Sequence, residues 1–530
     1  MNVRDIEIPF VEERTWKYRF WEIFPGAVSW TILLMPLVLS IFNTTLFAVY
    51  IIGFLLIWFV KSIGLNIRSL QGFRTMSQQK KLDWQVLMDD IEAGEVLHDH
   101  KWIPRWHRQN VARLKEQPLC LPPSEVIHAL IIATYNESRD ILEPTIKSCL
   151  ASKYDMKKVI LMIAYEERDG AQSKQSALDL VKEYGDDFMH AIAVGHPMLP
   201  GEVRGKGGNV TYAGRVLQKY LEKEKIDPLR VIVTTLDSDN RPHALYLSAL
   251  TYTYCSTEDP RYVSYQPIPM YTNNIWDAPS PMRVIATGNS FWNIVLSMRP
   301  HMLRNFSSHA QGMQALIDCD FWSVRTIVED GHQFWRTYFR YDGRHEVYPI
   351  YLPIYQDAVL SSTYRKTLKA QFIQLRRWAW GASDIAYVAK MGFRKGSKVP
   401  RTDMVFKFAR LVEGHISWAT ASLILAFGAL IPVLVQPKNY VAQSLPHIAS
   451  NIETLALAGI FITLFLSFKS LPPKPERYKR HRNIFMVLQW VLLPVTTILY
   501  NTFAAVYSQT RLMFGWYLGN FDVTDKAVKK

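Results

Sequence analysis

Residues 126–137 read VIHALIIATYNE, an apolar run that ends in the polar letters TYNE. A short run of this kind, rich in β-branched residues, is typical of a strand buried on both faces of a sheet. Residues 158–167 (KVILMIAYEE) and 230–239 (RVIVTTLDSD) have the same form. Because helix-like stretches separate the three runs, the pattern predicts an α/β domain with a mostly parallel sheet.

The polar residues after these strands are the first candidates for a binding site. Ligands of open parallel sheets bind beyond the carboxyl ends of the strands. Thr134 and Glu137 follow the first strand, Glu166 ends the second, and Asp237 and Asp239 follow the third. We therefore expect these side chains to gather at one edge of the sheet.

Long apolar segments flank the α/β domain on both sides. Residues 24–63 are mostly apolar, with the polar letters NTT at 43–45 in the middle. Since about 20 apolar residues cross a bilayer, this segment predicts two membrane spans joined by a tight turn, with one very long helix as the alternative. Three further apolar segments lie at 409–435, 452–468 and 483–508.

The charge distribution sets the expected orientation in a membrane. The chain has a net charge of +14, and no basic cluster resembles a nucleic-acid-binding module. Residues 469–482 hold six basic residues and one acid, whereas 436–451 hold one lysine. By the positive-inside rule, we place 469–482 in the cytoplasm and 436–451 outside. The α/β domain and the N-terminus are then cytoplasmic as well.

These patterns divide the chain into seven segments. They are a cytoplasmic N-terminus (1–23), two spans (24–63), a helical connector (64–125), the α/β domain (126–364), interfacial helices (365–408), about three spans (409–508) and a tail (509–530). The four cysteines, Cys120, Cys149, Cys255 and Cys319, are widely spaced and form no metal or redox motif. They fit a reduced compartment without a disulfide framework.

Residues 371–380, QFIQLRRWAW, stand shortly before the apolar run at 409–435. They contain two adjacent arginines and two tryptophans. Because Trp and Arg favour the headgroup region of a membrane, the stretch predicts an interfacial helix.

Two motifs have the chemistry of a phosphate site. Asp237 and Asp239 flank one small residue, and paired carboxylates suit Mg²⁺ or Mn²⁺ that shares its ligands with substrate phosphates. Residues 204–209 read RGKGGN, in which glycines allow close backbone approach and Lys206 can neutralise phosphate. A plain surface turn is the alternative for each motif. The glycine spacing differs from that of a Walker loop, so an ATPase is excluded.

Residues 328–331, VEDG, provide two carboxylates for acid–base chemistry. Glu329 and Asp330 precede a helix-like stretch, so one interpretation is a helix cap. The other is a general base that takes a proton from an attacking hydroxyl.

The order of these motifs resembles that of a known enzyme family. ATYNE, GKGGN, DSD, TGNSFW, VED and QLRRW occur in the order of family-2 glycosyltransferases with the GT-A fold. The closest resemblance is to the membrane-integrated, processive branch that includes cellulose, chitin and hyaluronan synthases. It covers roughly residues 126–382, and NFDVTDK at 520–526 resembles the FxVTxK gating loop of cellulose synthase. Ala133 replaces a common proline, VED replaces TED, and YEERD replaces DDxS.

The resemblance implies a role for each matching residue. Thr134, Tyr135, Glu137, Glu166, Lys206, Asp237, Gln374, Arg377, Thr524 and Lys526 would bind the nucleotide sugar. Asp237 and Asp239 would hold Mg²⁺ or Mn²⁺, and Asp330 would be the catalytic base beside Glu329. Trp378, Gly288 and Asn289 would contact the acceptor.

The resemblance also implies the reaction. The enzyme would transfer a hexose with inversion from a nucleotide sugar, with UDP favoured over GDP, to a growing β-linked polysaccharide at the cytoplasmic membrane face. Single transfer to a lipid-linked acceptor is the alternative. An inactive membrane scaffold is disfavoured because the acids and the QxxRW motif are intact.

One conflict concerns the side on which the tail lies. Three full spans after the domain would place Thr524 and Lys526 outside, away from any donor. We therefore favour a segment 483–508 that enters the membrane and returns, broken at Pro494, which is possible where protein or water covers the backbone. The alternatives are a different number of spans and a chance match of the tail motif.

Overall fold

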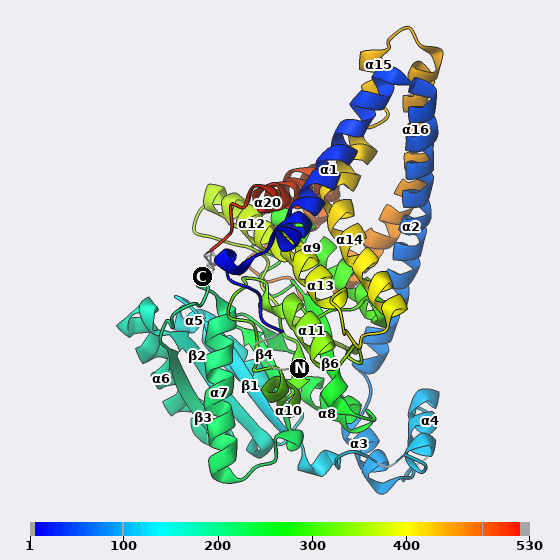
Figure 1. Cartoon of the computed structure of the whole chain (residues 1–530). Coiled ribbons are helices and arrows are strands. Elements are labelled where there is room, and N and C mark those ends of the chain that lie inside the picture. The colour runs from blue at the N-terminus through cyan, green and yellow to red at the C-terminus, as the bar shows by residue number, and fades with distance from the viewer. Residues whose placement is uncertain (1–5, 98–99, 118, 480, 520–530) are drawn as a thin grey trace.

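The computed structural model describes residues 6–97, 100–117, 119–479 and 481–519. Thr524 and Lys526, expected to close over the donor, lie outside the described residues. Figure 1 shows two parts, a sheet domain at the base and long helices that rise from it.

The sheet has eight strands in the order β3-β2-β1-β4-β7-β6-β8-β5. The strands are β1 (Ile127–Thr134), β2 (Val159–Glu166), β3 (His190–His196), β4 (Val231–Asp237), β5 (Arg241–Pro242), β6 (Val263–Met270), β7 (Ala310–Gly312) and β8 (Glu346–Tyr355). Strands β3, β2, β1 and β4 are parallel, as are β6 and β8, whereas β7 and β5 pair antiparallel with their neighbours. The sheet is therefore mixed, with the expected parallel half around β1.

Helices cover both faces of the sheet because side chains of a strand alternate between faces. On β1, Ile127, Ala129 and Ile131 belong to one core, whereas Leu130 and Ile132 belong to the other. The first core is shared with α7 (Lys206–Glu224) and α10 (Met313–Asp318). The second is shared with α3 (Trp84–Ala93), α5 (Arg139–Leu150), α6 (Ala171–Tyr184) and α8 (Tyr246–Cys255). Both cores hold the carboxyl ends of β1 and β4 in place.

The N-terminal apolar segment forms two helices, α1 (Trp16–Phe42) and α2 (Thr44–Gln79). Between them Asn43 caps α2, since its side chain accepts a hydrogen bond of 2.9 Å from the backbone N–H of Leu46. The alternative of one continuous helix is therefore wrong. Both helices extend past the expected 24–63, and α2 runs into the connector, where α3 and α4 (Arg105–Leu114) follow.

Four segments of the described chain are long and apolar enough to cross a membrane: α1, α2, Tyr440–Ser470 and Arg482–Phe514. The segment expected at 409–435 is not among them. It forms α14 (Arg401–Phe427) and the short α15 (Ile431–Val435), and the first half of α14 carries five charged residues. The expected loop at 436–451 is helical from Tyr440, where α16 (Tyr440–Leu457) begins and leads into α17 (Gly459–Ser470).

The last apolar segment changes its helix type around Pro494. It contains α18 (Arg482–Leu488), a 3₁₀ turn at Gln489–Leu492, α19 (Leu493–Thr496), a π turn at Thr497–Thr502 and α20 (Phe503–Phe514). Proline lacks an N–H donor, which accounts for the irregular turns on either side of it. Helix α20 packs on α1, where Ser29 Oγ donates to Gln509 Oε1 at 2.7 Å.

The chain then returns to the sheet domain. Tyr517 and Leu518 share an apolar cluster with Val203, Ile327 and Val328. The described end of the chain therefore lies next to the VED motif.

Candidate active site

One cavity of about 880 Å³ begins at the carboxyl ends of β1 and β4 and continues between the helices. Its walls come from α2, α9 (Ser280–Ser297), α11 (Glu329–Arg340), α12 (Tyr364–Ala379), α13 (Asp384–Gly392) and α14. Every described residue that the sequence assigned to the site lines it: Thr134, Tyr135, Glu137, Glu166, Lys206, Asp237, Asp239, Gly288, Asn289, Glu329, Asp330, Gln374, Arg377 and Trp378.

Glu137 joins the ends of the two central strands. Its Oε2 accepts a hydrogen bond of 2.9 Å from Thr134 Oγ1, and its Oε1 accepts one of 2.8 Å from Ser238 Oγ. The register places Ala133 opposite Asp237, so the loops after β1 and β4 are neighbours. Glu137 thus fixes one wall of the cavity.

A second wall is formed by Tyr135 and Glu166. The guanidinium carbon of Arg168 lies 4.7 Å from the centre of the Tyr135 ring, and Arg168 donates to the Glu166 carboxylate. Glu166 is itself buried at the end of β2. The three side chains form a compact group of one ring, one cation and one acid beside the strand ends.

Lys206 stands between two acids of the site. As the first residue of α7, it places Nζ 2.8 Å from Asp237 Oδ1 and 3.7 Å from Asp330 Oδ1. Burial opposes its charge, but the carboxylates of Asp237, Asp330 and Glu329 outweigh that effect and raise the pKa of Lys206. The lysine is therefore a fixed positive charge at the centre of an acidic group.

The glycine after Lys206 is required by close packing. A Cβ atom at Gly207 would lie 2.4 Å from the backbone oxygen of Ser323. Any larger residue would push the start of α7, and Lys206 with it, away from the acids. This is the physical reason for a glycine in the GKGG motif.

Asp237 and Asp239 are held by neighbouring loops. Asp237 Oδ2 accepts a hydrogen bond of 2.8 Å from Ser307 Oγ, and Asp239 Oδ2 accepts one of 2.9 Å from the backbone N–H of Asp357. No group of three or more His, Cys, Asp or Glu residues in the described part of the chain could hold a metal ion. Two carboxylates fit a divalent ion only if substrate phosphates complete its shell, as is usual for Mg²⁺.

Of the two VED acids, Asp330 is the one open to the cavity. Its side chain is 23% exposed, whereas Glu329 is buried. Burial and the charge of Asp330 raise the pKa of Glu329 to about 8. The helix cap interpretation does not apply to Asp330, because Val328 occupies the N-cap of α11 without a side-chain hydrogen bond.

His309 lies beside Asp330, with Nδ1 3.8 Å from Asp330 Oδ1. The indole N–H of Trp322 donates to His309 Nε2 at 3.1 Å. Nδ1 therefore carries the hydrogen and donates to the backbone oxygen of Phe306 at 2.9 Å. Burial lowers the pKa of His309, so the ring is a neutral wall of the site.

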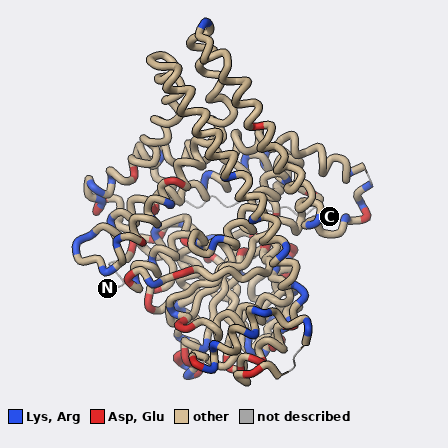
Figure 2. The backbone as a smooth tube through the Cα atoms, turned by 90° about the vertical axis from the view of Figure 1, so that its right-hand side faces the viewer, with Lys and Arg blue, Asp and Glu red and all other residues tan. Residues whose placement is uncertain are grey.

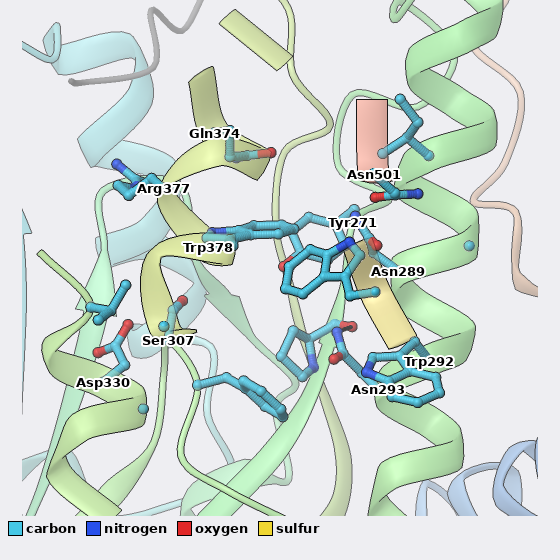
Figure 3. A pocket seen from close by; sticks show the side chains of 18 of the residues that line it. Tyr271, Asn289, Trp292, Asn293, Ser307, Asp330, Gln374, Arg377, Trp378 and Asn501 are labelled. Atoms are coloured by element: carbon cyan, nitrogen blue, oxygen red, sulfur yellow. Dashed lines mark hydrogen bonds between the residues drawn. The ribbon is translucent and has the colours of Figure 1, made fainter. Parts of the chain in front are cut away.

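The QxxRW motif lies on α12, which starts after Thr363, whose hydroxyl accepts from the backbone N–H of Lys366 at 3.2 Å. Gln374, Arg377 and Trp378 are three and four residues apart and so share one face. Figure 3 shows Trp378 projecting into the middle of the cavity, between the side of Arg377 and Asp330 and the side of Asn289 and Trp292. The motif therefore lies between the acids at the sheet domain and the side chains of α9.

The other face of α12 packs against α20. Ser508 Oγ donates to the backbone oxygen of Arg376 at 2.7 Å, and the Arg376 guanidinium lies 5.8 Å from the Tyr507 ring centre. The helix expected at the membrane interface is thus enclosed by protein on two sides.

Some residues of the site were missed from the sequence. The Tyr271 ring lies 6.1 Å from that of Trp378, and Ser307, His309 and Asp357 surround the acids. His332 and Asp384, both buried, are joined by a 2.7 Å contact between His332 Nδ1 and Asp384 Oδ1. Only their position close to VED and QxxRW could have drawn attention to this pair.

Neither a protein-family model nor a curated protein matches the chain. Among solved structures, the chain is similar to a mannosyltransferase from Pyrobaculum calidifontis in complex with GDP-Man and Mn²⁺. The two share 15% identity with a TM-score of 0.39, over 84% of this chain and 99% of that one. It is also similar to S. aureus TarS 1–349 in complex with UDP-GlcNAc, with 12% identity and a TM-score of 0.36, over 76% and 95% of the two chains. At these values the likeness carries no argument about function.

Proposed function

We propose that the chain is a membrane-bound glycosyltransferase of the GT-A fold that uses a nucleotide-sugar donor. One observation carries this proposal: a single cavity is lined by the paired acids Asp237 and Asp239, by Asp330, and by Arg377 and Trp378 of QxxRW. These are the groups needed to hold a diphosphate, activate a hydroxyl and support an acceptor sugar.

The donor would bind with its diphosphate near Lys206 and Arg377. Asp237 and Asp239 would hold Mg²⁺ or Mn²⁺, which, when bound, offsets negative charge on the departing diphosphate. Thr134, Tyr135, Glu137 and Glu166 would contact the nucleotide. Fixed positive groups at the place where charge develops stabilise the transition state without reorganisation.

Asp330 acts as the base in this mechanism. It takes the proton from an acceptor hydroxyl, whose oxygen attacks the anomeric carbon while the bond from that carbon to the diphosphate oxygen breaks. A single displacement inverts the configuration, so an α-linked donor yields a β-linkage. The neutral ring of His309 leaves Asp330 as the proton acceptor.

The acceptor would rest on Trp378, with Gly288 and Asn289 beside it. A growing β-linked polysaccharide is our first candidate, because the motif order is that of the processive branch. A lipid-linked sugar is the second candidate, and the positively charged Arg299 and Arg410, which line the cavity next to the long helices, favour it. Both candidates use the same base and the same donor site.

We further propose that α1, α2, the apolar second half of α14 with α15, and Tyr440–Ser470 lie in the membrane with the sheet domain in the cytoplasm. Ile424 and Ala429 of the α14–α15 segment pack against Phe47 and Ile51 of α2, and four crossings return the chain to the cytoplasmic side. Figure 2 shows charged residues over the sheet domain and very few along the outer parts of the long helices. The return of Leu518 to Val203 and Val328 supports a re-entrant segment Arg482–Phe514. The proposed role of Thr524 and Lys526 in closing over the donor requires a tail on the cytoplasmic side.

The test is to incubate the purified protein in nanodiscs with Mn²⁺ or Mg²⁺, radiolabelled nucleotide sugars and a lipid extract, and to size the product. A labelled high-molecular-weight polymer from one donor supports the processive synthase and identifies its sugar. A single labelled lipid supports transfer to a lipid-linked acceptor. Absence of nucleotide release with every donor and lipid overturns the proposed function.

A further inference from the structure

The far end of the cavity carries an excess of positive charge. Its lining there includes Lys61 of α2, Arg299 and Arg304 of the segment after α9, and Arg410 of α14, with Glu413 as the acid. Lys61 and Glu413 neutralise each other, since Lys61 Nζ lies 2.7 Å from Glu413 Oε1 and joins α2 to α14. Arg304 lies over the rings of Phe334 and Trp335, and Arg410 lies over the Phe406 ring and near the Glu413 carboxylate.

Arg299 and Arg410 form no ion pair with the described residues, and Arg68 of α2 donates only to the backbone oxygen of Gly64, at 3.1 Å. The three guanidinium groups come from three elements. Arg299 and Arg410 line the same end of the cavity, and burial and the positive charges of Arg68 and Arg410 lower the pKa of Arg299. We call these three arginines (Arg68, Arg299, Arg410) the cationic mouth. Because like charges that lie close together repel each other, the cationic mouth favours the binding of an anion between them.

The cationic mouth lies at the level expected for lipid headgroups. The apolar part of α2 ends at Val60, and Arg68 follows about 12 Å further along the helix at 1.5 Å per residue. Around it Ile67 of α2 and Phe406 of α14 are exposed apolar residues. A lipid chain could therefore lie along the helices while its phosphate faces the arginines.

We propose that the cationic mouth binds the phosphates of a lipid diphosphate-linked sugar, which is the acceptor of the transfer. This inference rests on the proposed function and names the acceptor class. A neutral glycan offers nothing for the arginines to bind, whereas each guanidinium can bind phosphate oxygens through two parallel hydrogen bonds. The sugar beyond the phosphates then points along the same cavity towards Trp378 and Asp330.

The sugar transfer itself takes place at the other end of the cavity, next to Asp330. A hydroxyl of the lipid-linked sugar loses its proton to Asp330 and forms the new bond to the anomeric carbon of the donor. The nucleoside diphosphate leaves with the electron pair of the broken bond. The phosphates of the lipid remain intact at the cationic mouth and serve only to anchor the acceptor.

The experiment measures lipid binding to the full chain in nanodiscs of phosphatidylcholine. The probes are a polyprenyl diphosphate that carries one sugar and, as a matched neutral lipid, a polyprenyl glycoside without phosphate. The variants are Arg299→Gln with Arg410→Gln, and Arg410→Gln alone, which changes an exposed residue and keeps the test valid if the double variant fails to fold. Arg401→Gln is the control, because Arg401 is exposed on the same helix α14 and does not line the cavity.

We expect the diphosphate probe to bind at least tenfold more tightly than the neutral glycoside. The double variant should lose that advantage, Arg410→Gln should lose part of it, and Arg401→Gln should keep it. Equal binding of both probes, or wild-type binding by the variants, overturns the inference. If the wild type releases nucleotide from a donor yet shows no preference for diphosphate, the lipid inference fails alone. If it prefers diphosphate but consumes no nucleotide sugar, the proposed function fails instead.

Discussion

The two ends of the cavity carry opposite charge. The end formed by the sheet domain is lined by Glu137, Glu166, Asp237, Asp239, Glu329, Asp330, Asp357 and Asp384, with Lys206 and Arg377 as the cations. The end next to the long helices is lined by Lys61, Arg299, Arg304 and Arg410, with Glu413 as the acid. Each end therefore has an excess of charge of one sign. A donor that binds with its cation at one end and an acidic acceptor at the other would offset both.

The ends also differ in how they are built. The acids sit on the carboxyl ends of strands whose register is fixed by backbone hydrogen bonds, and Glu137 ties two of these ends together. The cations come from α2, α14 and the segment after α9, and the ion pair of Lys61 with Glu413 joins α2 to α14. A fixed geometry suits a chemical step, and a looser one suits a ligand that enters from the side.

Among the variants at the acidic end of the cavity, Asp330→Asn should cause the largest loss of transfer activity. The amide keeps the shape of the side chain but cannot take the proton, so we expect transfer to fall by about 10³-fold. Donor binding, measured by calorimetry, should change little, because the proposed nucleotide contacts are made by other residues. Asp179→Asn, on the exposed face of α6, is the matched control. Transfer at the wild-type rate by the Asp330 variant would exclude this carboxylate as the base.

Treatment with a chelator tests whether Lys206 can stabilise the leaving diphosphate without a divalent metal ion. With EDTA we expect transfer to fall by about 10²-fold and to recover with Mn²⁺, since a bound cation offsets the charge of the leaving diphosphate. Binding of Mn²⁺ in the presence of nucleotide, followed by electron paramagnetic resonance, gives a readout apart from activity and should weaken in Asp239→Asn. Turnover that EDTA leaves unchanged would mean that Lys206 and Arg377 suffice.

Trp378 lies between the two ends of the cavity, and Trp378→Ala should weaken binding of the acceptor rather than of the donor. Loss of an aromatic contact worth about 1–1.5 kcal/mol corresponds to roughly a tenfold rise in KM for the acceptor. Trp378→Phe should restore part of it, and Trp16→Ala, at an exposed position, should have no effect. A change confined to donor affinity would place Trp378 in the donor site instead.

The strands and the acidic half of the cavity could be predicted in part from the sequence. Strands β1, β2 and β4 are uninterrupted apolar runs, and their polar ends identify the acidic half of the cavity. Strands β6 and β8 were not predicted from the sequence, because each contains two prolines and proline argues against a central strand. The prolines are Pro267 and Pro269 in β6 and Pro349 and Pro353 in β8. The pairing of the two strands shifts register between Pro267 and Ile268, a local irregularity that no sequence pattern encodes.

The cationic half could not be predicted, for a different reason. Arg68, Arg299 and Arg410 are far apart in the chain, and no short spacing joins them. Arg410 and Glu413 were instead assigned to an expected span at 409–435. Likewise, His332 and Asp384 meet only because α11 and α13 pack together. Contacts of this kind depend on tertiary packing rather than on motif spacing.

Glu329→Gln gives the smallest expected effect, on stability rather than catalysis. The pKa of Glu329 is raised from an ordinary 4.5 to about 8 in the folded chain, so the folded state binds this proton more tightly than the unfolded state. The resulting stabilisation is complete below about pH 4.5 and is lost as the pH rises through about 8. The wild type should therefore lose stability with rising pH in this range more steeply than the variant, whose amide does not titrate.

The measurement is thermal unfolding of both proteins in the same detergent between pH 5 and 8.5. Subtracting the variant from the wild type isolates the titration of one carboxyl, because all other groups are shared. Glu116→Gln, at an exposed position, should leave the wild-type slope unchanged. Parallel pH profiles for the wild type and Glu329→Gln would show that Glu329 ionises normally, and the acidic end would then hold one more negative charge for Lys206 and the donor's cation to balance.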